Sequence, residues 1–169
     1  MPALQWFFRQ QQMLRLLVLL FCLFDMQFFR GLHNIRPFDQ GCVLTIGNFD
    51  GVHLGHQSIL DRVKAKGAEL GIPAAAMVFE PQPKEYFDLK GAPARLSTLA
   101  EKVELFQEQG LDALACMAFN DRFRGLSAQQ FVEQVLVKGL NVKALIVGDD
   151  FRFGNDRAGD FEYLVKAGK

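Results

Sequence analysis

The chain has 169 residues, of which half are hydrophobic and 22% are charged, with 19 basic and 19 acidic side chains. This length gives one ordinary domain, and the composition is globular rather than disordered. Nucleic-acid binders usually carry a basic excess, so the balanced charge argues against a nucleic-acid partner. The cysteines Cys22, Cys42 and Cys116 are odd in number and lack metal-ligand spacing. They favour a reducing, cytoplasmic location over a disulfide framework.

Residues 1–25 read differently from the rest of the chain. Leu16–Phe24 is an unbroken apolar run of nine residues behind Arg9 and Arg15. It is too short for a membrane-spanning helix, which needs about 20 apolar residues, and no small-x-small cleavage site follows it. Three interpretations are open: an upstream extension before a true start at Met26, a signal or membrane anchor, or an amphipathic helix. The first is favoured, which makes 26–169 the domain and gives no membrane partner unless the leader is translated.

From residue 41 onward, strand and helix patterns alternate. The apolar run at 42–46 predicts a strand, and the helical period over 54–70 predicts a helix that stops at 71–73. A strand follows at 74–79, and Pro81, Pro83 and Pro93 mark a long loop. A capping box at Thr98 opens a helix to residue 109, before a strand at 113–119. A second capping box at Ser127 opens a helix that Gly139 closes, and the last predicted strand is 144–147.

Strands alternating with helices of this length predict an α/β fold, with a Rossmann-like doubly wound parallel sheet and helices on both faces. Ligands of such sheets bind outside the carboxyl ends of the strands. We therefore expect the functional loops to be 47–56, 80–95, 119–127 and 148–159. These loops also contain the least core-like residues of the body.

The most informative loop is the stretch GNFDGVHLGHQ at 47–57, between the first strand and the first helix. His53 and His56 lie three residues apart, so both can point from the first helical turn toward one spot. Gly47, Gly51 and Gly55 let the backbone turn sharply and let a phosphate approach closely. The helix N-terminus adds free N–H groups, so the segment predicts a cradle for a triphosphate.

Other readings of this loop are weaker. The histidine pair could be half of a zinc site, but no third ligand has a compatible spacing, so no metal ligands are predicted. The histidines could also be purely structural helix caps. No Gly-Lys-Ser/Thr follows, which excludes a Walker A loop. The acidic residues at 149, 150, 156 and 160 do not fit the spacing of a calcium loop.

The HLGH motif resembles that of the nucleotidylyltransferase superfamily. The longer GNFDGVHLGH resembles the N-terminal FAD synthetase (FMN adenylyltransferase) module of the bacterial bifunctional riboflavin kinase/FAD synthetase family. The segments FEPQP at 79–83, ARLS at 94–97, 119–131 and VGDDFRFG at 147–154 agree with the same family. The resemblance extends from about Phe29 to Lys169.

The resemblance implies residues for each part of the site. His53 and His56 are expected to bind the ATP phosphates, and Asp150 is expected at the reacting centre. The remaining binding positions lie in the first, second and fourth loops. They are Gly47, Asn48, Phe49, Asp50, Gly51 and Gly55 around the phosphates, and Pro81, Pro83, Phe151, Arg152 and Phe153 on the flavin side.

The implied reaction joins the AMP of ATP to FMN and yields FAD and pyrophosphate, with Mg²⁺ carried mostly by the ATP phosphates and water. The family continues beyond this point with a further strand, an arginine-bearing turn and a riboflavin kinase domain. The domain is therefore expected to be C-terminally incomplete and the kinase domain absent. Two alternatives are an adenylyl- or cytidylyltransferase with another acceptor, and an inactive nucleotide-binding fragment. The sequence does not predict an oligomeric state.

Overall fold

Alternating strands and helices form the body of the chain, of which the computed structural model describes residues 26–168. The interpretations of residues 1–25 lie outside this range. The strands are β1 (Gln27–Arg30), β2 (Cys42–Ile46), β3 (Ala74–Glu80), β4 (Ala113–Ala118) and β5 (Val142–Ile146). The helical segments are η1 (Asp50–Val52), α2 (Leu54–Leu70), α3 (Pro83–Phe87), α4 (Leu99–Glu108), α5 (Asp121–Arg124), α6 (Ala128–Gln130), η2 (Phe131–Val137) and α7 (Phe161–Ala167).

The five strands form one parallel sheet in the order β1-β4-β3-β2-β5. Thr45 of β2 pairs with Ala76 of β3 on one side and with Ile146 of β5 on the other. From β2 the chain steps through β3 to β4, and then returns to place β5 on the opposite side of β2. Winding therefore reverses between β2 and β5, and the carboxyl ends at such a reversal are where ligands of open α/β sheets bind.

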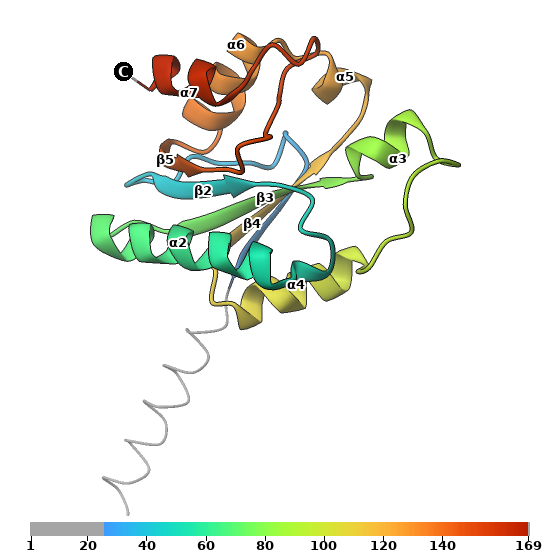
Figure 1. The fold of residues 1–169 in the computed structure, drawn as a ribbon. Coiled ribbons are helices and arrows are strands. Elements are labelled where there is room, and N and C mark those ends of the chain that lie inside the picture. Colours follow the sequence, from blue (N-terminus) through green and yellow to red (C-terminus); the bar gives the residue numbers. More distant parts are fainter. Residues whose placement is uncertain (1–25, 169) are drawn as a thin grey trace, which may run out of the picture.

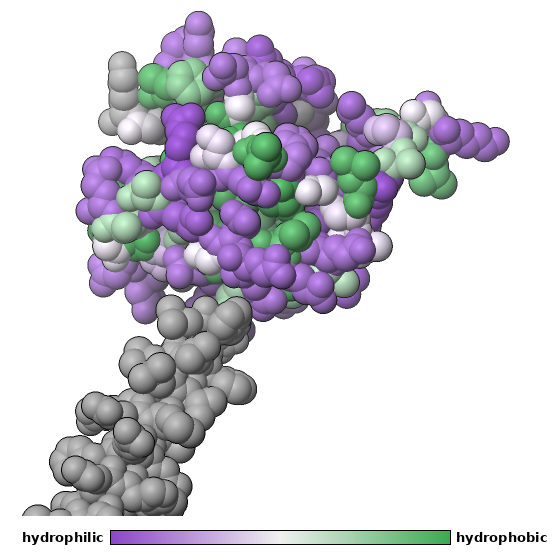
Figure 2. Space-filling view, turned by 60° about the horizontal axis from the view of Figure 1, so that its bottom comes forward, coloured by the Kyte–Doolittle hydropathy of each residue, from purple (hydrophilic) through white to green (hydrophobic). Residues whose placement is uncertain are grey.

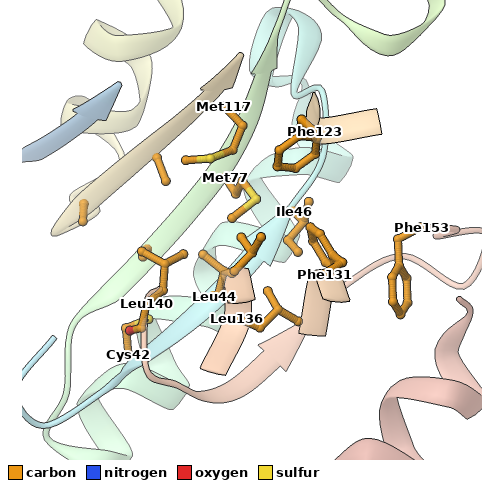
Figure 3. Packing of buried hydrophobic residues seen from close by; sticks show 14 of the residues in the cluster. Cys42, Leu44, Ile46, Met77, Met117, Phe123, Phe131, Leu136, Leu140 and Phe153 are labelled. Atoms are coloured by element: carbon orange, nitrogen blue, oxygen red, sulfur yellow. The ribbon is translucent and has the colours of Figure 1, made fainter. Parts of the chain in front are cut away.

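Helices cover both faces of the sheet, which confirms the predicted doubly wound α/β architecture (Figure 1). Successive residues of a strand point to opposite faces. Val43 accordingly packs with Leu60 of α2 and Phe106 of α4. Leu44 packs on the other face in a cluster that includes Phe131 at the start of η2 and Met77 of β3 (Figure 3).

The long elements follow the sequence prediction closely. The strand at 42–46 and the helix at 54–70 are confirmed with the same bounds. Thr98 and Ser127 both cap their helices through capping boxes, and the turn after α6 widens into the π-helical η2. The short elements β1, α3, α5 and α7 were not predicted, because four to seven residues carry too few repeats to show a period.

Seen obliquely from the side of α2 and α4, the surface is mostly hydrophilic, with small separate hydrophobic areas (Figure 2). This pattern is expected for helices that turn their apolar sides toward a sheet. Within residues 26–168, no helix combines the length and apolarity needed to cross a membrane.

Candidate active site

The turn between β2 and α2 has a strained backbone. Phe49 (φ 47°) and Val52 (φ 40°) lie in the left-handed region, which costs non-glycine residues about 1–3 kcal/mol each. Gly51 (φ 71°) reaches the same region without that cost. The side chains of Phe49 and Val52 are each only 2% exposed, so core packing holds the strain in place. Strain stored in one turn at the carboxyl edge of the sheet is typical of a ligand-binding segment.

His53 and His56 lie side by side at the start of α2. Their rings stack with centroids 3.7 Å apart and an interplanar angle of 19°. His53 is the N-cap residue, and its Nδ1 accepts a hydrogen bond from the backbone N–H of His56 at 3.4 Å. Because Nδ1 accepts this bond, the ring proton lies on Nε2, where it can be donated. A Cβ at Gly55 would lie 3.3 Å from the His53 ring, so glycine leaves room for this stack.

The environment of His56 favours its neutral form. Burial lowers the pKa of His56, and the neighbouring charges of His53 and Lys102 lower it further. The ring also packs against Phe49, with centroids 5.0 Å apart. The buried Nδ1 of His56 has no hydrogen-bond partner within the described residues. Together with the free N–H groups of the first turn of α2, the pair forms a cradle suited to phosphate oxygens.

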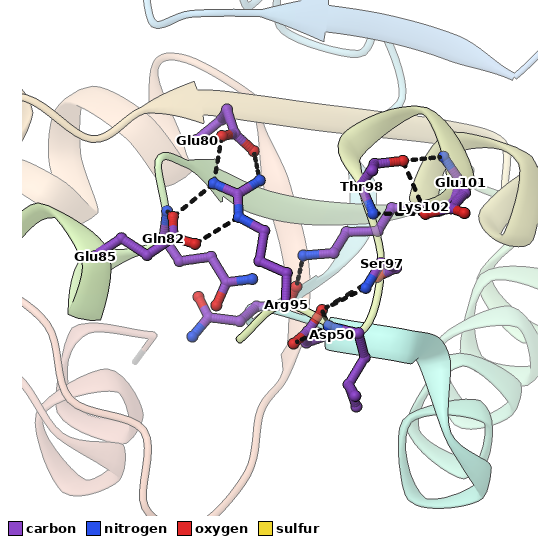
Figure 4. A network of polar contacts seen from close by, with 11 residues as sticks. Asp50, Glu80, Gln82, Glu85, Arg95, Ser97, Thr98, Glu101 and Lys102 are labelled. Atoms are coloured by element: carbon purple, nitrogen blue, oxygen red, sulfur yellow. Dashed lines mark hydrogen bonds and ion pairs between the residues drawn. The ribbon is translucent and has the colours of Figure 1, made fainter. Parts of the chain in front are cut away.

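The polar groups of this turn are held by residues 96–102 (Figure 4). The Asp50 carboxylate accepts hydrogen bonds from the backbone N–H groups of Leu96 and Ser97 at 2.9–3.0 Å. Partial burial would raise the pKa of Asp50, but these hydrogen bonds outweigh it and lower the pKa. Lys102 is 2% exposed and donates from Nζ to the carbonyl oxygen of Asn48 at 2.8 Å. Asp50 and the Asn48 carbonyl therefore shape the turn through internal bonds.

An aromatic cavity of about 240 Å³ lies between the loops that follow β3, β4 and β5. The rings of Phe79, Phe119 and Phe123 contact one another with centroid separations of 5.6–6.1 Å. Phe151 and Phe153 stack at 5.6 Å with an interplanar angle of 22°. The other residues that line the cavity are Pro83, Phe87, Arg124, Leu126, Phe131, Arg152, Gly154, Asn155 and Arg157. Aromatic faces with three arginines suit a flat, anionic ligand.

The structure gathers most of the residues expected on the flavin side. Pro83, Phe151, Arg152 and Phe153 all line the cavity. Pro81 follows a cis peptide bond and is not among the lining residues. Asp150 lies in the exposed turn after β5, where the backbone N–H of Phe151 bonds the carbonyl oxygen of Gly148. No hydrogen bond of the described residues joins Asp150 to the histidine pair.

Sequence reasoning gave no role to Arg95, Ser97 or Lys102, although all three organise the loops. A lysine in an amphipathic helix is normally read as solvent-facing. Lys102, however, lies four residues before the buried Phe106 and so shares its face of α4. That spacing is the signal that could have indicated its burial, although not its partner. The sequence places Phe119, Phe123 and Phe131 in the family motif at 119–131, and the structure shows in addition that they line the cavity.

An open parallel sheet with a histidine-bearing turn at its reversal point and an aromatic cavity between neighbouring loops is an architecture typical of nucleotide-binding α/β proteins. A family model described as FAD synthetase matches residues 35–169. The chain therefore belongs to the FAD synthetase family.

Its curated relatives agree with this assignment. The chain is 55% identical over 143 residues to the bifunctional riboflavin kinase/FMN adenylyltransferase of Pseudomonas fluorescens, covering 85% of this chain and 46% of that protein. It is 51% identical over 144 residues to the protein of the same name from Escherichia coli K12, with the same coverage. For the Haemophilus influenzae protein the identity is 49%, covering 85% of this chain and 47% of that protein. The chain thus spans about half the length of these relatives.

A solved structure shares the fold. The crystal structure named as a macrolide-efflux protein from Streptococcus pneumoniae superposes with a TM-score of 0.70 at 24% identity. The match covers 83% of this chain and 47% of that chain. At this identity the likeness supports the architecture alone.

Proposed function

We propose that this chain transfers the AMP group of ATP to FMN, forming FAD and pyrophosphate. The observation that carries this proposal is the phosphate cradle and the aromatic cavity on neighbouring loops of one sheet edge. The names of the relatives point to the same reaction. Both substrates are small molecules, and the unpaired, buried Cys42 and Cys116 suit a reducing, cytoplasmic compartment. The riboflavin kinase activity named for the relatives is not part of the proposal.

The two substrates divide between the two halves of the site. The ATP phosphates take the cradle formed by His53, His56 and the first turn of α2, with Mg²⁺ bound to phosphate oxygens and water. The isoalloxazine ring takes the aromatic cavity, where it can stack on aromatic side chains. Arg124, Arg152 and Arg157 line the same cavity and suit the FMN phosphate.

The reaction needs positioning rather than a protein nucleophile. An oxygen of the FMN phosphate attacks the α-phosphorus of ATP in line, and the bond from that phosphorus to the oxygen bridging to the β-phosphate breaks. Pyrophosphate leaves with the bonding electrons, so negative charge grows on the α- and β-phosphate oxygens. His53 and His56 act as hydrogen-bond donors to those oxygens. Asp150, after β5, is assigned to the reacting centre by its motif.

The direct test is chromatographic detection of FAD after incubation of the 169-residue chain with FMN and MgATP. The chain is expected to form FAD, and the His53→Ala/His56→Ala double variant is not. A chain that forms no FAD, does not quench FMN fluorescence and does not bind ATP would refute the proposal. Binding of both ligands without FAD would identify a nucleotide-binding fragment. ATP binding without FMN binding would favour a transferase with another acceptor.

A further inference from the structure

One short segment, Arg95–Ser97, contacts both substrate loops (Figure 4). It lies between α3 and α4, and none of its residues lines the cavity or belongs to the histidine-bearing turn. Its two ends point in different directions: Ser97 toward the turn after β2, and Arg95 toward the end of β3 and α3.

On the ATP side, Ser97 is buried and bonds two residues of the turn. Its Oγ accepts a hydrogen bond from the backbone N–H of Gly51 at 2.9 Å. The backbone N–H of Ser97 donates to the Asp50 carboxylate at 3.0 Å. The segment also fits tightly, since a Cβ at Gly51 would lie 3.1 Å from Cβ of Leu96. The conformation of the histidine-bearing turn therefore depends on where this segment lies.

On the flavin side, Arg95 bridges two acidic residues. Its Nη1 and Nη2 donate to the Glu80 carboxylate at 2.9 and 2.6 Å, and its Nε and Nη2 donate to Glu85. Glu80 ends β3, directly after the cavity residue Phe79. Glu85 lies in α3, whose first residue Pro83 and last residue Phe87 both line the cavity. Arg95 thus fixes α3 against the end of β3.

These ion pairs contribute little to global stability, because the Arg95 side chain is 30% exposed and such pairs are worth about 0–1 kcal/mol. Their geometric effect is larger, since a bidentate pair fixes direction as well as distance. A ligand that orders one loop also orders the segment tied to it. A second ligand at the other loop then meets a smaller ordering cost.

We propose that Arg95–Ser97 couples the two substrate sites, so that nucleotide in the histidine cradle raises the affinity of the aromatic cavity for flavin, and the reverse. The proposal rests on the proposed function for the identity of the ligands. By linkage, the same factor applies in both directions, and such factors typically lie in the range of about 5- to 150-fold.

The test measures the coupling factor, which is the ratio of the FMN dissociation constants without and with saturating Mg²⁺ and α,β-methylene-ATP. FMN fluorescence quenching reports binding in the full 169-residue chain. Arg95→Met and Ser97→Ala disrupt opposite ends of the segment. Lys66→Met is the matched control, because Lys66 pairs with Glu69 on the exposed side of α2 and lies outside the segment and both parts of the site. Thermal unfolding of each variant verifies that it is folded.

The wild-type chain and Lys66→Met are expected to show a factor of about five or more, and both segment variants a factor near one. If Arg95–Ser97 served each loop separately, Arg95→Met would weaken FMN alone and Ser97→Ala would weaken nucleotide alone, with the factor intact. That result would overturn the coupling, as would a wild-type chain that binds both ligands independently. If Arg95→Met fails to fold, Arg95→Lys takes its place. Lysine keeps the charge without the bidentate geometry, so this variant is expected to give an intermediate coupling factor. A wild-type chain that binds neither ligand would instead overturn the proposed function.

Discussion

Replacing His56 by alanine separates catalysis from folding in this site. The change removes ring contacts with His53 and Phe49, each worth about 0.5–1.5 kcal/mol. It also removes the buried Nδ1, which has no hydrogen-bond partner among residues 26–168, and eliminating an unsatisfied polar group offsets part of that loss. The variant should therefore remain folded. In the transition state of the proposed reaction, the variant lacks one hydrogen-bond donor to a phosphate oxygen, and its rate should fall by about 10²–10³, equivalent to about 2.7–4 kcal/mol.

The assay is FAD formation at saturating FMN and MgATP, with thermal unfolding measured on the same samples. His33→Ala is the control, since His33 is an exposed histidine outside the site, and it should keep the parental rate. A His56→Ala rate within about five-fold of the parent would refute the role given to the cradle. A loss of rate that merely follows a loss of folded protein would refute the separation between catalysis and folding.

Three further outcomes are expected. Phe87→Ala should weaken FMN binding by about two- to ten-fold in a fluorescence titration, because Phe87 lines the cavity. Leu89→Ala is the control and should leave FMN binding unchanged, because Leu89 is not among the lining residues. Equal effects of the two variants would count against flavin in the cavity. Burial lowers the pKa of His56 below 6.5, so the contribution of His56 to stability is complete above pH 6.5 and is lost as the pH falls through the folded-state pKa. In urea unfolding, the free energy of unfolding of the wild type should therefore exceed that of His56→Gln by less as the pH falls from about 8 to about 5. A difference between the two that does not change with pH would contradict the burial argument. Gly139→Ala would place a Cβ 2.6 Å from the carbonyl oxygen of Val135. The free energy of unfolding of this variant should therefore fall by about 1–3 kcal/mol. An unchanged midpoint in chemical denaturation would contradict this expectation and show that the end of η2 can shift.

The sequence by itself determined the elements whose signals are local and repeated. The helix over 54–70 shows several turns of one apolar stripe, and its end at Gly71 requires the left-handed backbone that glycine adopts freely (φ 66°). The capping boxes at Thr98 and Ser127 are also local, because both partners lie within one helical turn. The GNFDGVHLGH turn identified the family and placed the histidine pair on a helix start, as the structure shows.

Only the tertiary structure decided which loops meet and which polar residues hold them. The order β1-β4-β3-β2-β5 depends on packing between strands far apart in sequence, and it brings the loops after β3, β4 and β5 around one aromatic cavity. Asp50 belongs to the turn motif, yet its carboxylate binds backbone N–H groups 46 and 47 residues away instead of standing free for a ligand. The sequence places Arg95 in the ARLS motif and Lys102 in a helix, but it assigns neither residue a partner. Their roles come from partners at Asn48, Glu80 and Glu85, and no local pattern can encode a hydrogen bond whose acceptor is delivered by another part of the fold.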